Sequence, residues 1–191
     1  MIYLFNIDGT ICEGWYGKQS PMYYKDEIDA ATRALSSDCY EYTKPLPHAI
    51  DFITKLQKER ETDTKIKIGV LSLIHSPQEW EQKKAFINRN FLYTVNSCDD
   101  TSLPLFDADM FFGAISQDEK YYQMKRIMLI HDSNIIYFDD NMEFLIQIQQ
   151  KEMNKNAKYH LILPIHSSCM LTREPHEILT AYQTYTIRIR P

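Results

Sequence analysis

Short apolar runs alternate with longer amphipathic segments along most of the chain, and this alternation constrains the fold more than any other feature. The runs with the length and composition of β-strands are residues 2–5, 66–71, 110–115, 135–138 and 159–163. Several of these runs are rich in β-branched and aromatic residues. That composition is typical of strands that are buried on both faces of a parallel sheet.

Helical patterns fill the gaps between these runs. Residues 49–56 carry apolar side chains at helical spacing after two prolines. The next two helices are expected to begin at Ser76 and Ser116, because each serine has glutamate three residues later, the spacing of a capping box. A fourth helix is expected to begin near Asp140 or Asn141.

This order of strands and helices predicts an α/β fold in which a doubly wound parallel sheet carries helices on both faces. A length of 191 residues and a hydrophobic content of 44% suit one core, so residues 1–191 are expected to form a single domain. Residues 12–44 interrupt the alternation and are expected to form a small cap insertion over one end of the sheet. Residues 182–191 alternate apolar and polar side chains, which suits an edge strand or an interaction arm.

Composition excludes several classes of function. The formal charge is −5 and neither end carries a basic block, so general nucleic-acid binding is not expected. The four cysteines are far apart and form no CxxC pair, which disfavours a zinc site and a disulfide scaffold. No run approaches the roughly 20 apolar residues of a membrane span. We therefore expect a cytoplasmic protein without a membrane segment, and its oligomeric state stays open.

Polar side chains follow three of the predicted strands at the point where each strand ends. Asn6 and Asp8 follow the first, Ser72 follows the second, and Asp139 and Asp140 follow the fourth. Ligands of open parallel sheets bind at the carboxyl ends of the strands. These side chains are therefore expected to form one site.

The paired carboxylates of Asp139 and Asp140 indicate a cation. Two adjacent acids after an apolar run are costly unless a cation or hydrogen-bond donors meet them. One of them could cap the following helix, but this leaves the other aspartate and Asp8 unexplained. A hard cation such as Mg²⁺, held by one or two carboxylates, waters and a ligand phosphate, explains all three.

A phosphate beside these acids needs a positive charge, and Lys120 and Lys125 are the candidates. If Ser116 caps its helix, Lys120 lies in or next to the first turn. Lys125 then lies about 7 Å farther along the axis, at about 1.5 Å per residue. This geometry favours Lys120 and leaves Lys125 as the fallback.

Two further lysines lie close after Ser72, in the segment that contains Trp80, Lys83 and Lys84. A buried tryptophan next to solvated lysines is the expected arrangement there, so neither lysine is assigned to the site.

Taken in order, these residues resemble the four motifs of the haloacid dehalogenase-like phosphohydrolases. The matching residues are Asn-Ile-Asp-Gly-Thr at 6–10, Ser72 at the end of Ile-Gly-Val-Leu-Ser, Lys120 on a helix, and the pair Asp139-Asp140. The resemblance covers about residues 1–165 and depends mainly on the first and last motifs. Residues 45–56, 68–72 and 80–91 also look similar to the 5'(3')-deoxyribonucleotidase branch.

The resemblance implies a Mg²⁺-dependent phosphomonoester hydrolase that acts on a nucleotide or another small phosphate through an aspartyl-phosphate. It puts Asn6 at the nucleophile position, Asp8 in the acid/base role, and Ser72 and Lys120 on the phosphoryl oxygens. The metal ligands that it implies are the Asn6 side-chain oxygen, the Asp8 backbone carbonyl, Asp139 and, in support, Asp140. A small lid would leave the site open enough for a nucleotide.

Asn6 departs from this pattern at the residue that would form the covalent intermediate. An amide oxygen is neutral and weakly nucleophilic, so the chain is expected to hydrolyse its ligand very slowly or not at all. The metal loses an anionic ligand, which weakens its binding, while an incoming phosphate meets less negative charge. Phosphate binding is therefore expected to survive.

Two explanations of Asn6 stay open. Either it replaces an aspartate and traps the substrate of an enzyme, or the chain is a natural pseudophosphatase that binds or sequesters a phosphorylated ligand. Retention of Asp8 favours the first, because a protein without catalysis has no need of the acid/base residue. A third reading, a scaffold for protein contacts alone, leaves the clustered acids unexplained.

Overall fold

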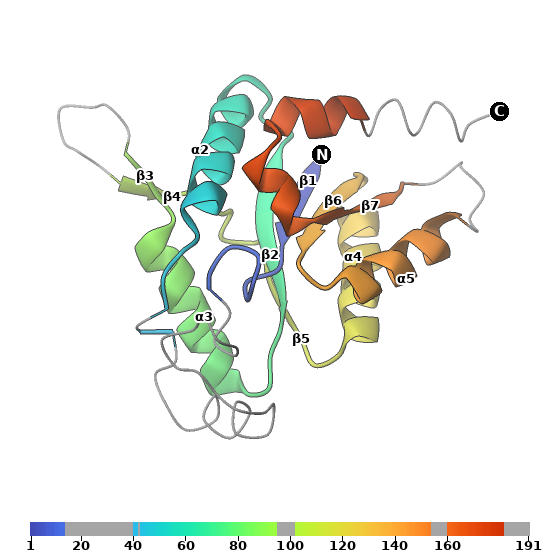
Figure 1. The fold of residues 1–191 in the computed structure, drawn as a ribbon, viewed down its shortest axis with the longest axis horizontal. Helices are drawn as coiled ribbons and strands as arrows, with labels where there is room; N and C mark the ends of the chain where they lie inside the picture. The colour runs from blue at the N-terminus through green and yellow to red at the C-terminus, as the bar shows by residue number, and fades with distance from the viewer. Residues whose placement is uncertain (14–39, 42, 95–101, 154–159, 182–191) are drawn as a thin grey trace.

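The computed structural model describes residues 1–13, 40–41, 43–94, 102–153 and 160–181 (Figure 1). Most of the insertion expected at residues 12–44 lies outside the described residues, and so does the whole segment 182–191. Both expectations therefore stay predictions. The single domain is likewise a prediction.

A parallel sheet of five strands forms the centre of the molecule. Its strands are β1 (Ile2–Phe5), β2 (Lys67–Leu73), β5 (Phe111–Ala114), β6 (Ile135–Asp139) and β7 (Ile162–His166), in the spatial order β5-β2-β1-β6-β7. The chain winds from β1 to one edge through β2 and β5, and then fills the other side with β6 and β7. The predicted doubly wound α/β fold is confirmed.

Helices cover both faces of this sheet (Figure 1). The helices α2 (Pro47–Thr62) and α3 (Pro77–Asn90) lie on one side, and α4 (Gln117–His131) and α5 (Met142–Met153) lie on the other. Within the described parts of the chain, no helix is both long enough and apolar enough to span a membrane.

The core has two layers because alternate residues of each strand point to opposite faces. In β1, Tyr3 and Phe5 pack in the layer formed with α2 and α3, whereas Ile2 and Leu4 pack in the layer formed with α4 and α5. All four side chains are at most 1% exposed. Because β1 is the central strand, the residues that follow it lie in the middle of the edge formed by the carboxyl ends of the strands.

Side-chain caps fix where the helices begin. Ser76 Oγ accepts a hydrogen bond from the backbone nitrogen of Glu79 at 3.1 Å, and Ser116 Oγ accepts one from Glu119 at 3.1 Å. Asn141 Oδ1 accepts one from the nitrogen of Phe144 at 3.0 Å. The capping residue of α5 is therefore Asn141, which leaves the carboxylates of both preceding aspartates for the site.

Two strands, β2 and β7, have a boundary that differs from the prediction by more than one residue. β2 continues to Leu73, so that Ser72 lies inside the strand and is fully buried. β7 covers Ile162–His166 instead of residues 159–163, because its register pairs Ile162 with Ile135 and His166 with Asp139. In both cases, hydrogen bonding to a neighbouring strand extends the strand over polar residues. A search for apolar runs does not include such residues in the strand.

A small antiparallel hairpin of β3 (Leu92–Thr94) and β4 (Ser102–Pro104) was not predicted. The chain after β7 forms the 3₁₀ helix η1 (Ser167–Leu171), which contacts α2, and a helix over residues 175–181.

Candidate functional site

The candidate site lies at the carboxyl ends of β1 and β6, which are neighbours in the sheet. The winding direction of the chain reverses between these two strands, which is where open α/β sheets place their ligands. Asn6 follows β1, and its backbone nitrogen donates to the carbonyl of Phe138 at 2.8 Å. This bond holds the end of β1 beside Asp139, the last residue of β6.

The side-chain amide of Asn6 connects both halves of the site. Its Nδ2 lies 3.0 Å from the backbone carbonyl of Asp8 and 3.4 Å from Oδ1 of both Asp139 and Asp140. Its Oδ1 accepts a long hydrogen bond of 3.5 Å from Nζ of Lys120. This orientation is electrostatically favourable, because the amide oxygen faces an ammonium group and the amide nitrogen faces oxygens.

A tight turn at Gly9 allows the carboxylate of Asp140 to lie against the backbone that follows β1. Gly9 has a φ of 68°, in the left-handed region that favours glycine. A Cβ at Gly9 would lie 2.2 Å from Asp140 Oδ2, so no other residue fits without moving that carboxylate. Thr10 Oγ1 donates to Asp140 Oδ1 at 3.3 Å. The turn therefore requires glycine for its backbone angle and for the approach of Asp140.

Asp139 is held by donors on both of its oxygens, and its side chain is 1% exposed. Oδ2 accepts from Nζ of Lys120 at 2.7 Å and from the hydroxyl of Tyr137 at 2.5 Å, while Oδ1 accepts from the nitrogen of Asn141 at 3.0 Å. The ammonium of Lys120 also lies 5.2 Å and 5.1 Å from the ring centroids of Tyr137 and Phe144. Lys120 thus packs between two aromatic rings and a carboxylate.

Burial and the two neighbouring acids shift several pKa values here. Desolvation lowers the pKa of Lys120, against the opposing effect of the Asp139 charge. Burial, followed by the charge of Asp139, raises the pKa of Tyr137 well above its ordinary value and keeps its hydroxyl protonated. Desolvation and then the charge of Asp139 raise the pKa of Asp140. A bound cation would relieve the second of these effects, the repulsion between the two carboxylates.

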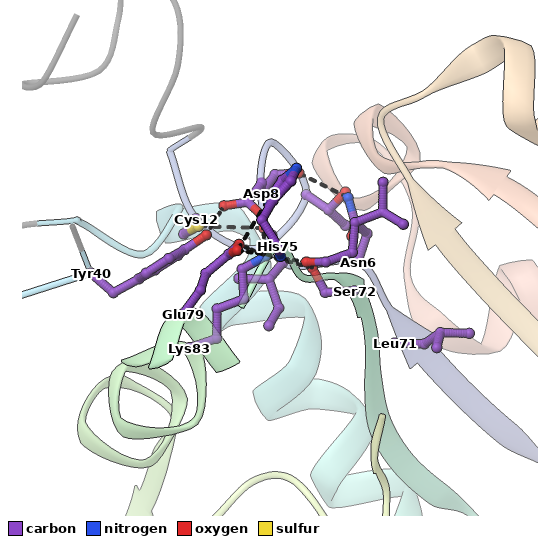
Figure 2. A network of polar contacts seen from close by, with 12 residues as sticks. Asn6, Asp8, Cys12, Tyr40, Leu71, Ser72, His75, Glu79 and Lys83 are labelled. Carbon is purple, nitrogen blue, oxygen red and sulfur yellow. Dashed lines mark hydrogen bonds and ion pairs between the residues drawn. The ribbon is translucent and has the colours of Figure 1, made fainter. Parts of the chain in front are cut away.

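Asp8 is surrounded by residues that were not assigned to the site from the sequence (Figure 2). Its Oδ2 lies 2.8 Å from Nζ of Lys83, and its Oδ1 accepts from the hydroxyl of Tyr40 at 2.5 Å. The Lys83 side chain is 1% exposed. The expectation of a solvated lysine at position 83 is therefore wrong, because α3 packs this lysine against the end of β1.

Lys83 has further partners on β2 and α3. Its Nζ contacts Glu79 Oε1 at 2.8 Å, Ser72 Oγ at 3.2 Å and the carbonyl of Leu73 at 2.5 Å. Burial alone would lower the pKa of Lys83, but the charges of Asp8 and Glu79 outweigh it and the pKa is raised. The lysine is therefore a buried cation at the site, in agreement with the rule that buried charges are paired.

Glu79 completes this group from the first turn of α3. Its Oε2 accepts from the backbone nitrogen of His75 at 2.6 Å, and its side chain is 1% exposed. Desolvation acts to raise the pKa of Glu79, but the charge and hydrogen bonds of Lys83 and His75 prevail and the pKa is lowered.

The other lysines named from the sequence lie outside this group. Nζ of Lys125 pairs with Glu152 at 3.3 Å, between α4 and α5. Of the two candidates on α4, the structure thus brings Lys120, and not Lys125, to Asn6 and Asp139. Lys84 pairs with Glu81 at 2.6 Å beside the half-buried ring of Trp80.

The oxygens of the site fit a hard cation. The Asp8 carbonyl and one oxygen each of Asp139 and Asp140 all lie within 3.4 Å of the amide nitrogen of Asn6. Rotation of this amide by 180° would replace its nitrogen with its oxygen, a ligand of the kind that Mg²⁺ takes, and would give up the long bond from Lys120. Among the described residues, no group of three or more histidine, cysteine, aspartate or glutamate side chains could hold a metal. The set found here has two carboxylates, an amide and a backbone carbonyl.

Lys83, Glu79 and Tyr40 are the residues that sequence reasoning missed. A signal for two of them exists, because Glu79 and Lys83 are four residues apart in a helix that begins at the carboxyl edge of the sheet. Nothing in the sequence around Tyr40 points to Asp8.

No protein-family model, no curated protein and no solved structure matches this chain. The classification that is established is therefore the α/β fold with its five-stranded parallel sheet.

Proposed function

We propose that this chain is a haloacid dehalogenase-like protein that binds a phosphate ester at the ends of β1 and β6 without hydrolysing it. The observation that carries the proposal is the pair of buried lysines, Lys83 and Lys120, on either side of Asn6 and Asp8. Lys83 contacts Asp8, and Lys120 contacts the Asn6 oxygen. A nucleotide or another small phosphorylated molecule is the proposed ligand.

Anion binding is supported by the donors that these residues offer. Lys83 donates to the oxygen of Ser72, and the Ser72 hydroxyl donates to the carbonyl of Leu73 over a long 3.4 Å bond, which a bond to a phosphoryl oxygen would replace. Each lysine is paired with an aspartate, so neither charge is left uncompensated when the ligand is absent. A phosphate dianion would meet two ammonium groups, whose charge-assisted hydrogen bonds to phosphate are strong, and one hydroxyl donor.

Mg²⁺ is the proposed cofactor. Asp139 and Asp140, the carbonyl of Asp8 and the oxygen of a rotated Asn6 amide would hold it. When bound, the cation would neutralise the carboxylates and the charge of the phosphate. Desolvation and then the charge of Asp139 raise the pKa of Asp140, and a cation beside the two carboxylates would offset this cost.

Absence of hydrolysis follows from the chemistry of position 6. The Asn6 oxygen is part of a neutral amide and already accepts from Lys120, so it is a weak nucleophile. Asp8 stays beside it with Lys83 and Tyr40 on its two oxygens. The residues that would assist a reaction are therefore present while the attacking atom is not.

Calorimetry of the unaltered protein tests binding. We expect inorganic phosphate and at least one nucleoside monophosphate to bind with MgCl₂ present, at micromolar concentrations of protein, with no phosphate released from the ester. Ser72→Ala should weaken the binding, because it removes a donor to the phosphoryl oxygen. A panel without any binding ligand, with and without MgCl₂, would reject the proposal.

Asn6→Asp tests the relation to an enzyme. With an aspartate at position 6 and MgCl₂, we expect turnover of an aryl phosphate through an aspartyl-phosphate, and loss of this turnover in the double variant Asn6→Asp/Asp8→Asn. An Asn6→Asp protein that binds phosphate but stays inactive would support a dedicated binding protein instead of a disabled hydrolase.

A further inference from the structure

Asp139 Oδ2 has two side-chain donors at once. Lys120 donates from 2.7 Å and the hydroxyl of Tyr137 donates from 2.5 Å. Tyr137 lies two residues before Asp139 on β6, so both side chains point to the same face of the sheet. The second donor is unexpected, because one ammonium group would suffice for a carboxylate oxygen that is already beside a cation.

We propose that Tyr137 is a positioning residue that allows Lys120 to leave Asp139 and bind the phosphate. This inference rests on the proposed function. To reach a phosphoryl oxygen, Lys120 has to weaken or give up its bond to Asp139. Oδ2 of a side chain that is 1% exposed would then lose its cation and have no water to replace it. Tyr137 keeps that oxygen hydrogen-bonded while Lys120 moves.

The surroundings of Tyr137 prevent its hydroxyl from following Lys120. The side chain is fully buried, and its ring packs edge-on against Phe144 with centroids 6.2 Å apart. The hydroxyl also lies near a second acceptor, the carbonyl of Leu71, at the longer distance of 3.4 Å. Tyr137 is thus a fixed donor, whereas Lys120 is a longer and more adaptable one.

Lys120 also has a direction in which to move. Its bond to Asn6 Oδ1 is 3.5 Å long and therefore weak, and it points toward the centre of the site. A phosphate beside Asn6 would offer a charged acceptor in that direction. A shift of the ammonium from Asp139 toward the ligand would exchange one ion pair for another.

The test is Tyr137→Phe, which removes the hydroxyl and retains the ring. We expect the dissociation constant of inorganic phosphate, measured by calorimetry with MgCl₂, to rise about tenfold, the value of one hydrogen bond to a charged group. The matched control is Tyr3→Phe. Tyr3 is also buried in the sheet, its hydroxyl has no hydrogen-bond partner among the described residues, and it faces the layer of α2 and α3. The control should bind phosphate as the unaltered protein does.

A double-mutant cycle with Lys120→Met separates this role from a merely structural one. Because Tyr137 acts through Lys120, the double variant should bind phosphate no more weakly than Lys120→Met alone. The ¹⁵N resonance of the Lys120 ammonium should shift on addition of phosphate in the unaltered protein, and shift less in Tyr137→Phe.

Each outcome has one reading. If Tyr137→Phe binds phosphate as tightly as the unaltered protein, this inference is overturned and the proposed function stands. The same holds if the losses of phosphate affinity in Tyr137→Phe and Lys120→Met are additive in the double variant. Absence of phosphate binding by the unaltered protein would overturn the proposed function itself and this inference with it.

Discussion

The ammonium of Lys83 lies 2.8 Å from Oδ2 of Asp8, and the lysine side chain is 1% exposed. This contact joins α3 to the turn after β1, two segments that are far apart in the sequence (Figure 2). It places a buried cation beside the residue that the haloacid dehalogenase resemblance puts in the acid/base role. Stability and the proposed ligand binding should therefore be coupled at this point of the fold.

Lys83→Met should destabilise the protein severely. The substitution leaves Asp8 and Glu79, which are 12% and 1% exposed, without their shared cation. Removing one partner of a buried ion pair typically costs about 3–5 kcal/mol, which urea unfolding would measure. The double variant Lys83→Met/Glu79→Gln should regain part of this loss, because it removes one of the stranded charges.

Lys84→Met is the control for this experiment. Lys84 lies next to Lys83 on α3 but pairs with Glu81, whose side chain is 70% exposed. Exposed pairs contribute at most about 1 kcal/mol, so this variant should unfold almost as the unaltered protein does. If Lys83→Met and Lys84→Met have equal unfolding free energies, the buried ion pairs of Lys83 do not stabilise the protein.

Glu79 should make stability depend on pH in the acid range. Its pKa in the folded protein lies below the ordinary value of 4.5, so below that value the unfolded chain binds its proton first. The stabilisation from Glu79 is therefore complete above pH 4.5 and is lost as the pH falls through the folded pKa. The difference in unfolding free energy between the unaltered protein and Glu79→Gln should narrow on acidification. A difference that is the same at pH 7 and in the acid range would contradict this.

Gly9→Ala should damage both the fold and the proposed cation site. The φ of 68° disfavours alanine, and the added Cβ would lie 2.2 Å from Oδ2 of Asp140. Strain of this kind costs about 1–3 kcal/mol, and displacement of Asp140 should weaken Mg²⁺ binding measured by calorimetry. For comparison, Gly113→Ala meets the end of the flexible Ile74 side chain at 2.8 Å, and should leave Mg²⁺ binding unchanged.

Lys120 and Lys125 should differ in their effect on phosphate binding. Lys120→Met removes the ammonium beside Asn6 and Asp139, and should weaken the binding of inorganic phosphate by about tenfold or more. Lys125→Met removes a partner of Glu152 between α4 and α5, and should change stability without changing phosphate affinity. Calorimetry of both variants decides between the two lysines, and a larger loss of affinity in Lys125→Met would reverse the assignment.

The architecture and half of the site could be predicted from local patterns. Apolar runs give strands and serine caps give helix starts, because both depend on neighbours in the sequence. Asn6 and Asp139 were placed at one edge for a similar reason, since parallel strands deliver the residues after them to the same end of the sheet. Strand pairing, which reaches across the sequence, shifted the bounds of β2 and β7.

What the sequence by itself determined is the order of the elements, the edge of the sheet at which the polar residues meet, and the missing charge at Asn6. Only the tertiary structure decided the partners of these residues. The spacing of Lys83 from Glu79 sets it apart from Lys84, but nothing in the local sequence shows that Lys83 is buried or that it contacts Asp8. The packing of α3 against β1 and β2 buries Lys83 and leaves Lys84 at the surface. Burial of a charged side chain depends on contacts between segments that are distant in the sequence. A buried ammonium group also needs carboxylate partners, which for Lys83 are Asp8 and Glu79.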